Sequence, residues 1–115
     1  DTQEAIDYIV KKVVNLRVFD DAEGIMNLSV QDIKGDILLV SQFTLMASTK
    51  KGNRPSYIRA ARPEISVPIY ETLIKAFETT LDREIRTGEF GADMKIDLLN
   101  DGPVTIIIDS KQKDY

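Results

Sequence analysis

The sequence predicts a mixed α+β fold in a single domain that spans residues 1–115. Two stretches repeat apolar residues at helical spacing, and the segments around them alternate apolar and polar residues, as strands with one buried face do. A chain of 115 residues has the length of one domain. Its 43% hydrophobic and 30% charged residues can bury a core and still cover the surface, which excludes disordered, collagen-like and low-complexity proteins.

Helices are predicted in two places. At the start of the chain, Asp1 is predicted to be the N-cap residue of a helix, and Glu4, three positions later, is its reciprocal capping partner. Apolar residues then follow at helical spacing, namely Ile6, Ile9, Val10, Val13 and Val14. The second helix is predicted to have Pro68 in its first turn, where a missing N–H costs nothing, and to be broken at residues 87–91. Its apolar stripe comprises Ile69, Leu73, Ile74, Phe77 and Leu81.

Strands are predicted at residues 16–19 and 26–30, on either side of a turn. Residues 37–46 are too apolar for a half-exposed strand and are predicted to form a central strand. Residues 94–98 and 104–108 are joined by a tight turn, and we expect them to pair as an antiparallel hairpin. Residues 47–63 form a long loop, and loops of this length inside a compact domain are usually functional.

The composition excludes several kinds of site. The chain has no cysteine and no histidine, which removes disulfides, Ser/His/Asp and Cys/His triads and nearly every zinc site. No spacing of carboxylates calls for a divalent metal, and no glycine-rich loop fits a phosphate or a dinucleotide. We therefore expect no metal and no cofactor. The longest apolar runs are far too short to cross a membrane, and without a leader pattern the expected location is the cytoplasm.

Charge is unevenly distributed along the chain. The formal net charge is −4, yet residues 37–63 contain five basic and no acidic residues, which leaves −9 for the rest. Screening confines each field to about 8–10 Å, so a basic loop can hold phosphates even on an acidic body. On charge alone, the simpler interpretation is a solvated loop that the charges keep soluble.

Two short motifs are candidates for chemistry. Ser41, Gln42 and Thr44 place polar groups in the most hydrophobic segment, where they need hydrogen-bond partners or a ligand. Residues 100–105 contain Gly102 and Pro103, which suit either a plain hairpin turn or a backbone that presents bare carbonyls to a ligand. Taken alone, each motif is also typical of ordinary structure, and bonds to neighbouring backbone would satisfy the first.

Together these segments resemble the D-aminoacyl-tRNA deacylases of the bacterial type. These are dimeric enzymes that hydrolyse the ester bond by which D-amino acids and glycine are mischarged on tRNA. The likeness runs from about Ile6 to Ser110, and its two hallmarks are SQFTL at residues 41–45 and NDGPVT at residues 100–105. Supporting matches are NLRVF at 15–19, KGNRP at 51–55, AARP at 60–63 and GEFGADM at 88–94. The resemblance implies a barrel-like antiparallel or mixed sheet with two main helices. It also implies that the strands with which family members begin are missing here.

The resemblance assigns roles to residues of this chain. It implies a catalytic site at Ser41, Gln42 and Thr44, with Phe43 in the same pocket for the terminal aminoacyl-adenosine. Phe90 and Met94 would flank the adenine. Gly102 and Pro103 match a cross-subunit Gly-cisPro whose carbonyls enter the partner's pocket and exclude L side chains. The basic loop becomes a tRNA contact through Lys50, Lys51 and Arg54, in a homodimer that proofreads chirality.

The reaction mechanism and the function class have alternatives. Thr44 is the one pocket hydroxyl that qualifies as a nucleophile, but no base is evident to activate it. The resemblance favours assistance by the ribose 2′-hydroxyl of the tRNA, with the protein supplying orientation and backbone hydrogen bonds. A non-catalytic RNA-binding or assembly module of the same fold is the second function class. An unrelated metal-free hydrolase with a Ser or Thr nucleophile is a third, which the missing base disfavours.

Overall fold

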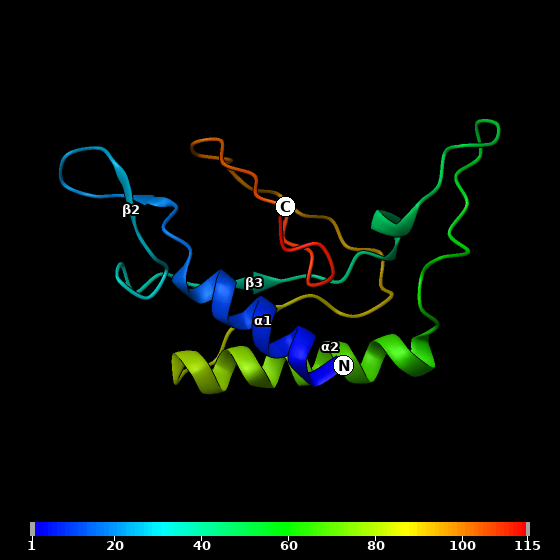
Figure 1. The fold of residues 1–115 in the computed structure, drawn as a ribbon, viewed down its shortest axis with the longest axis horizontal. Coiled ribbons are helices and arrows are strands. Elements are labelled where there is room, and N and C mark those ends of the chain that lie inside the picture. The colour runs from blue at the N-terminus through cyan, green and yellow to red at the C-terminus, as the bar shows by residue number, and fades with distance from the viewer. Residues whose placement is uncertain (1, 115) are drawn as a thin grey trace.

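Two packed helices form the core of the computed structural model, which describes residues 2–114. Helix α1 (Thr2–Asn15) lies across helix α2 (Pro63–Leu81) (Figure 1). Ile6, Val10 and Val14 recur every four residues on the buried face of α1 and pack with Phe77 of α2, which is 2% exposed. Both predicted helices are confirmed. The predicted N-cap at Asp1 lies outside the described residues.

The bounds of α2 differ from the predicted ones. The helix begins at Pro63, which takes the first-turn position that the sequence predicts for Pro68, and Pro68 lies inside the helix. Arg62 is extended, and its carbonyl accepts hydrogen bonds from the N–H groups of Ile65 and Ser66 at 2.9 Å each. The helix ends well before residues 87–91, because Asp82 adopts a left-handed conformation and its N–H bonds to the carbonyl of Glu78.

Short strands follow α1. Strands β1 (Phe19–Asp20) and β2 (Met26–Leu28) pair antiparallel, near the positions predicted for them. Asp21 holds the intervening turn, since its Oδ1 accepts the N–H of Glu23 at 2.9 Å and of Ile25 at 3.0 Å. These two N–H donors, that of Ile25 above all, lower the pKa of Asp21 below its usual range.

The predicted central strand over residues 37–46 is wrong in extent. Strand β3 comprises Leu38–Leu39 alone, and the 3₁₀ helix η1 occupies Phe43–Met46. The partner of β3 is the equally short β4 (Arg86–Thr87), which pairs with it in parallel. Beyond Leu39, no described segment pairs with residues 40–46 as a neighbouring strand. The backbone there forms local hydrogen bonds instead, from the Leu45 N–H to the Gln42 carbonyl and from the Ala47 N–H to the Thr44 carbonyl.

The predicted C-terminal hairpin is also wrong as a pair of strands. The chain does run out to a tip near residue 100 and return, but the structure assigns no strand to residues 92–108 (Figure 1). Several apolar side chains along both runs are at least half exposed, including Ile96, Leu98 and Ile106. An isolated two-stranded hairpin is marginal without a layer packed against it. The described residues contain two separate two-stranded sheets, so the expected barrel-like sheet is not confirmed.

The molecule is more open than its mass predicts. Its radius of gyration is 15.8 Å and its accessible surface 9507 Å², against roughly 13 Å and roughly 6,300 Å² for a compact domain of this size. The segment 47–62 stands away from the helices, which confirms the predicted long loop except for Pro63, the first residue of α2 (Figure 1). Over residues 2–114, no helix is long and apolar enough to span a membrane.

Candidate active site

A cavity of about 230 Å³ brings together five of the eight residues that the sequence placed at the substrate pocket. Ser41, Gln42 and Phe43 line it from the segment that follows β3, and Phe90 and Met94 line it from the segment that follows β4. The parallel pairing of β3 with β4 explains this meeting, because parallel strands direct their carboxyl ends to the same edge. Two motifs far apart in the sequence thus lie next to each other.

Sequence reasoning missed other residues of the same cavity. Asp93 supplies a carboxylate to the lining, next to Met94 in sequence, and it is paired with Lys95 at 3.1 Å. The remaining lining residues are Val40, Gly91, Ala92 and Ile96. All of them lie within two positions of a predicted residue, so the two motifs were the signal and only their extent was underestimated.

Tyr70 of α2 anchors the base of this cavity. Its hydroxyl lies 2.9 Å from the carbonyl oxygen of Leu39 and 3.2 Å from that of Gly88, so it can donate its proton to either strand end. Its ring is 9% exposed and lies 5.7 Å, centroid to centroid, from the ring of Phe90. One buried side chain therefore fixes both segments that line the cavity. The available sequence signal for this residue is a tyrosine beside the apolar stripe of a helix.

Thr44 lies just outside the residues that line the cavity. The side-chain amide of Gln42 donates a hydrogen bond of 2.6 Å to the Thr44 hydroxyl oxygen. Among residues 2–114, no carboxylate or amine accepts the Thr44 proton. The N–H groups of Phe43 and Thr44, which begin η1, also lack partners in the described chain. The arrangement orients a hydroxyl and offers amide donors, but it does not place a general base beside Thr44.

Gly102 and Pro103 are not part of this cavity within one chain. Their peptide bond is cis, as the resemblance implied, and both residues are exposed. The tip that carries them lies away from the η1 helix (Figure 1). The structure therefore separates the second hallmark from the first.

The basic residues Lys50, Lys51 and Arg54 are exposed on the long loop. A bridge between Ser48 and Ser56 closes the loop, with N–H to carbonyl distances of 2.8 and 2.9 Å. The loop is joined to the cavity by aromatic contact, since the Tyr57 ring meets the Phe43 ring edge-on at 5.0 Å.

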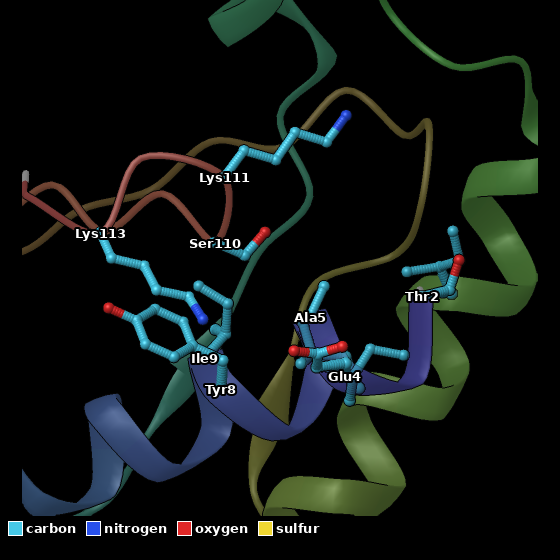
Figure 2. Close-up of a pocket in the computed structure, with 11 residues that line it drawn as sticks. Thr2, Glu4, Ala5, Tyr8, Ile9, Ser110, Lys111 and Lys113 are labelled. Carbon is cyan, nitrogen blue, oxygen red and sulfur yellow. The ribbon is translucent and has the colours of Figure 1, made fainter.

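A larger cavity of about 600 Å³ lies elsewhere, between α1, α2 and the C-terminal segment. Figure 2 shows the Lys113 ammonium beside the Tyr8 ring, 4.6 Å from its centroid, while Lys111 extends away from it. No residue of either hallmark lines this space, so its size does not make it the candidate site. Among residues 2–114, no group of three or more acidic side chains is placed to hold a metal ion.

Comparison with known proteins identifies the family. The family model described as D-Tyr-tRNA(Tyr) deacylase matches residues 1–109. The chain belongs to this deacylase family. The D-aminoacyl-tRNA deacylase of Bacteroides fragilis (strain YCH46) is 62% identical over 114 residues, which are 99% of this chain and 76% of that protein. The D-aminoacyl-tRNA deacylase of Flavobacterium psychrophilum is 59% identical over the same shares.

The structural comparison agrees with this family. A solved structure titled c-Myc DNA Unwinding Element Binding Protein superposes on the deacylase chain with a TM-score of 0.81 and 40% sequence identity. The match covers 92% of this chain and 72% of the solved one. The mixed α/β architecture with two helices is therefore shared, although the titles of the relatives differ.

Proposed function

We propose that this chain hydrolyses the ester bond of D-aminoacyl-tRNA, releasing the free D-amino acid and tRNA, and so proofreads chirality in translation. The observation that carries the proposal is the cavity in which Ser41, Gln42, Phe43, Phe90 and Met94 meet, in a chain of this family. In this proposal the terminal aminoacyl-adenosine occupies the cavity, with Phe90 and Met94 beside the adenine. Glycyl-tRNA mischarged on tRNA(Ala) is a second substrate, because glycine has no side chain for a chiral filter to reject.

The chemistry proposed for the site is positioning rather than strong acid–base catalysis. An aminoacyl ester is already activated, so orientation of the carbonyl and the attacking group supplies much of the rate. The 2′-hydroxyl of the terminal ribose assists the reaction, and the amide groups at Phe43 and Thr44 stabilise the developing oxyanion. Thr44 serves to orient, because its hydroxyl accepts the Gln42 amide and has no base beside it. Neither metal nor cofactor takes part.

Chiral selection is assigned to a second copy of the chain in a homodimer. Gly102 and Pro103 are exposed at a tip outside their own cavity, which leaves them free to enter the cavity of a partner. Their backbone carbonyls would fill the space that an L side chain needs, so specificity comes from steric rejection.

The long basic loop is the proposed tRNA contact. Lys50, Lys51 and Arg54 are exposed and lie in a segment without acidic residues, while the rest of the chain carries the negative charge. Phosphates are attracted to cations at short range, and the acidic body repels them elsewhere. This proposal replaces the simpler interpretation of the loop as a solvated surface.

Hydrolysis of D-Tyr-tRNA and L-Tyr-tRNA in the presence of a metal chelator tests the proposed function. We expect selective loss of the D-ester, and the same assay on a chain extended to the length of the relatives serves as the comparison. If neither chain hydrolyses the D-ester but both hold tRNA in a stable complex, the proposal is refuted in favour of a non-catalytic RNA-binding module. Loss of activity on adding chelator would refute the metal-free mechanism.

A further inference from the structure

An exposed aromatic pair lies at the rim of the candidate active site. The rings of Phe43 and Tyr57 are 5.0 Å apart, centroid to centroid, and meet at 75°. Phe43 is 56% exposed and Tyr57 38% exposed, so neither ring is used to build the core. Phe43 also lines the cavity, whereas Tyr57 does not. The pair therefore extends the apolar surface of the cavity outward, toward the long loop.

The backbone holds Tyr57 in a defined place. The two hydrogen bonds between Ser48 and Ser56 close the loop immediately before Tyr57. On its other side, the N–H of Ala60 donates to the Tyr57 carbonyl at 2.9 Å. Tyr57 is thus fixed at the foot of the loop, between the cavity and the exposed cations at Lys50, Lys51 and Arg54.

The surroundings of the Phe43–Tyr57 pair indicate a ligand that carries several negative charges and flat apolar rings. Residues 37–63 contain five basic residues and no acidic one. A protein partner that only covered apolar side chains would have no need of this charge. Single-stranded nucleic acid needs both features, because its bases stack on aromatic side chains while its phosphates meet Lys and Arg.

We propose that Tyr57, braced edge-on by Phe43, stacks the unpaired nucleotide that precedes the terminal adenosine at the 3′ end of the tRNA. The inference rests on the proposed function, since it takes the cavity as the site of the terminal aminoacyl-adenosine. A base stacked on Tyr57 then lies one step outward, and the phosphates beyond it approach the basic loop. Tyr57 is a positioning residue in this scheme and does not touch the reacting ester.

The test compares a long and a minimal substrate in the Tyr57→Ala and Tyr57→Phe variants. Loss of base–aromatic stacking reduces affinity by about 5- to 150-fold per base. We expect Tyr57→Ala to raise KM for D-Tyr-tRNA about tenfold while kcat stays within about twofold. KM for D-tyrosyl-adenosine, which lacks the stacked nucleotide, should not change. Tyr57→Phe keeps the ring and should behave as the unaltered protein. The matched control is Ile58→Ala, because Ile58 is the next residue and is 88% exposed.

Three outcomes overturn the inference. An equal rise in KM for both substrates would show that Tyr57 acts only by supporting Phe43 and the cavity. An unchanged KM for D-Tyr-tRNA would show that no base stacks there. Should the unaltered protein hydrolyse neither substrate, the proposed function fails by itself, and the inference is then tested by the Kd of uncharged tRNA. A Kd that does not change in Tyr57→Ala refutes the stacking site.

Discussion

Removal of the Tyr70 hydroxyl is expected to loosen the base of the candidate active site at a modest cost in stability. In Tyr70→Phe the ring remains against Phe90, and only the bond to the Leu39 or Gly88 carbonyl is lost. Leu39 keeps one hydrogen bond, from the Gly88 N–H at 3.1 Å. The Gly88 carbonyl has no second donor among residues 2–114, but Gly88 is only partly buried. The loss should therefore equal one net hydrogen bond, about 1 kcal/mol, rather than the larger penalty of an orphaned buried acceptor.

The assay for this variant combines unfolding with turnover. A change of about 1 kcal/mol lowers the folding equilibrium constant about fivefold and Tm by about 4 °C. We expect kcat/KM for D-Tyr-tRNA to fall by up to about fivefold, because both segments that line the cavity are held by this one hydroxyl. Tyr70→Leu should lose about 0.5–1.5 kcal/mol more, since it also removes the aromatic contact with Phe90.

The control is Tyr8→Phe, because the Tyr8 hydroxyl has no hydrogen-bond partner among residues 2–114 and its ring contacts to lysine survive the change. Its unfolding free energy and turnover should match the unaltered protein. The reasoning is refuted if Tyr70→Phe is as stable as the control, or if it loses stability while the cavity keeps full activity.

Four further predictions test the site and one turn. Thr44→Val should retain turnover within about tenfold; abolished turnover with unchanged binding would instead identify Thr44 as the nucleophile. Pro103→Ala should relax discrimination against L-Tyr-tRNA in the dimer, and an unchanged D/L ratio of kcat/KM would contradict the proposed filter. Gly88→Ala should raise KM several-fold, because its Cβ would overlap Met94 Sδ, and a second change, Met94→Ala, should recover part of the loss if that overlap is the cause. Since the pKa of Asp21 is lowered in the folded chain, its contribution to stability is present above the usual value of 3.8 and is lost as pH falls below it. Asp21→Asn should flatten the pH dependence of the unfolding free energy in that range, and an unchanged slope would count against it.

The helices could be predicted from the sequence because their information is local. The spacing of Ile6, Val10 and Val14 puts them on one face of the helix, and in the structure that face packs against Phe77. The bound of α2 was missed because two prolines were both suited to a first turn, and only the extended Arg62 decides between them. The strands over residues 37–46 and 94–108 failed for a different reason. A strand is stable only when a neighbouring strand hydrogen-bonds to its backbone. The alternation of apolar residues predicts which face of a strand is buried, but it does not identify that neighbouring strand.

The site was predicted in part for the same physical reasons. Ser41, Gln42, Phe43, Phe90 and Met94 could be named from their motifs, but their meeting depends on the two-residue parallel pairing of β3 with β4. That pairing is stabilised by a third element, since the hydroxyl from α2 reaches both strand ends. The sequence of either motif does not predict that it lies beside a segment so distant in the chain. The contact of Tyr57 with Phe43, on which its proposed role rests, is equally hidden from sequence, because it depends on where the closed loop places the Tyr57 ring.

The separation of charge along the chain supports the proposed binding of a nucleic-acid substrate. A protein with net charge −4 should repel tRNA at long range, which argues against the proposal if charge is averaged. The field that a phosphate meets within about 10 Å is set by its neighbours, and on the long loop those are the exposed Lys50, Lys51 and Arg54. The acidic remainder repels phosphates, which agrees with the proposed approach of the 3′ end along the basic loop. In the proposed complex, the same charges that make the average unfavourable would therefore orient the tRNA.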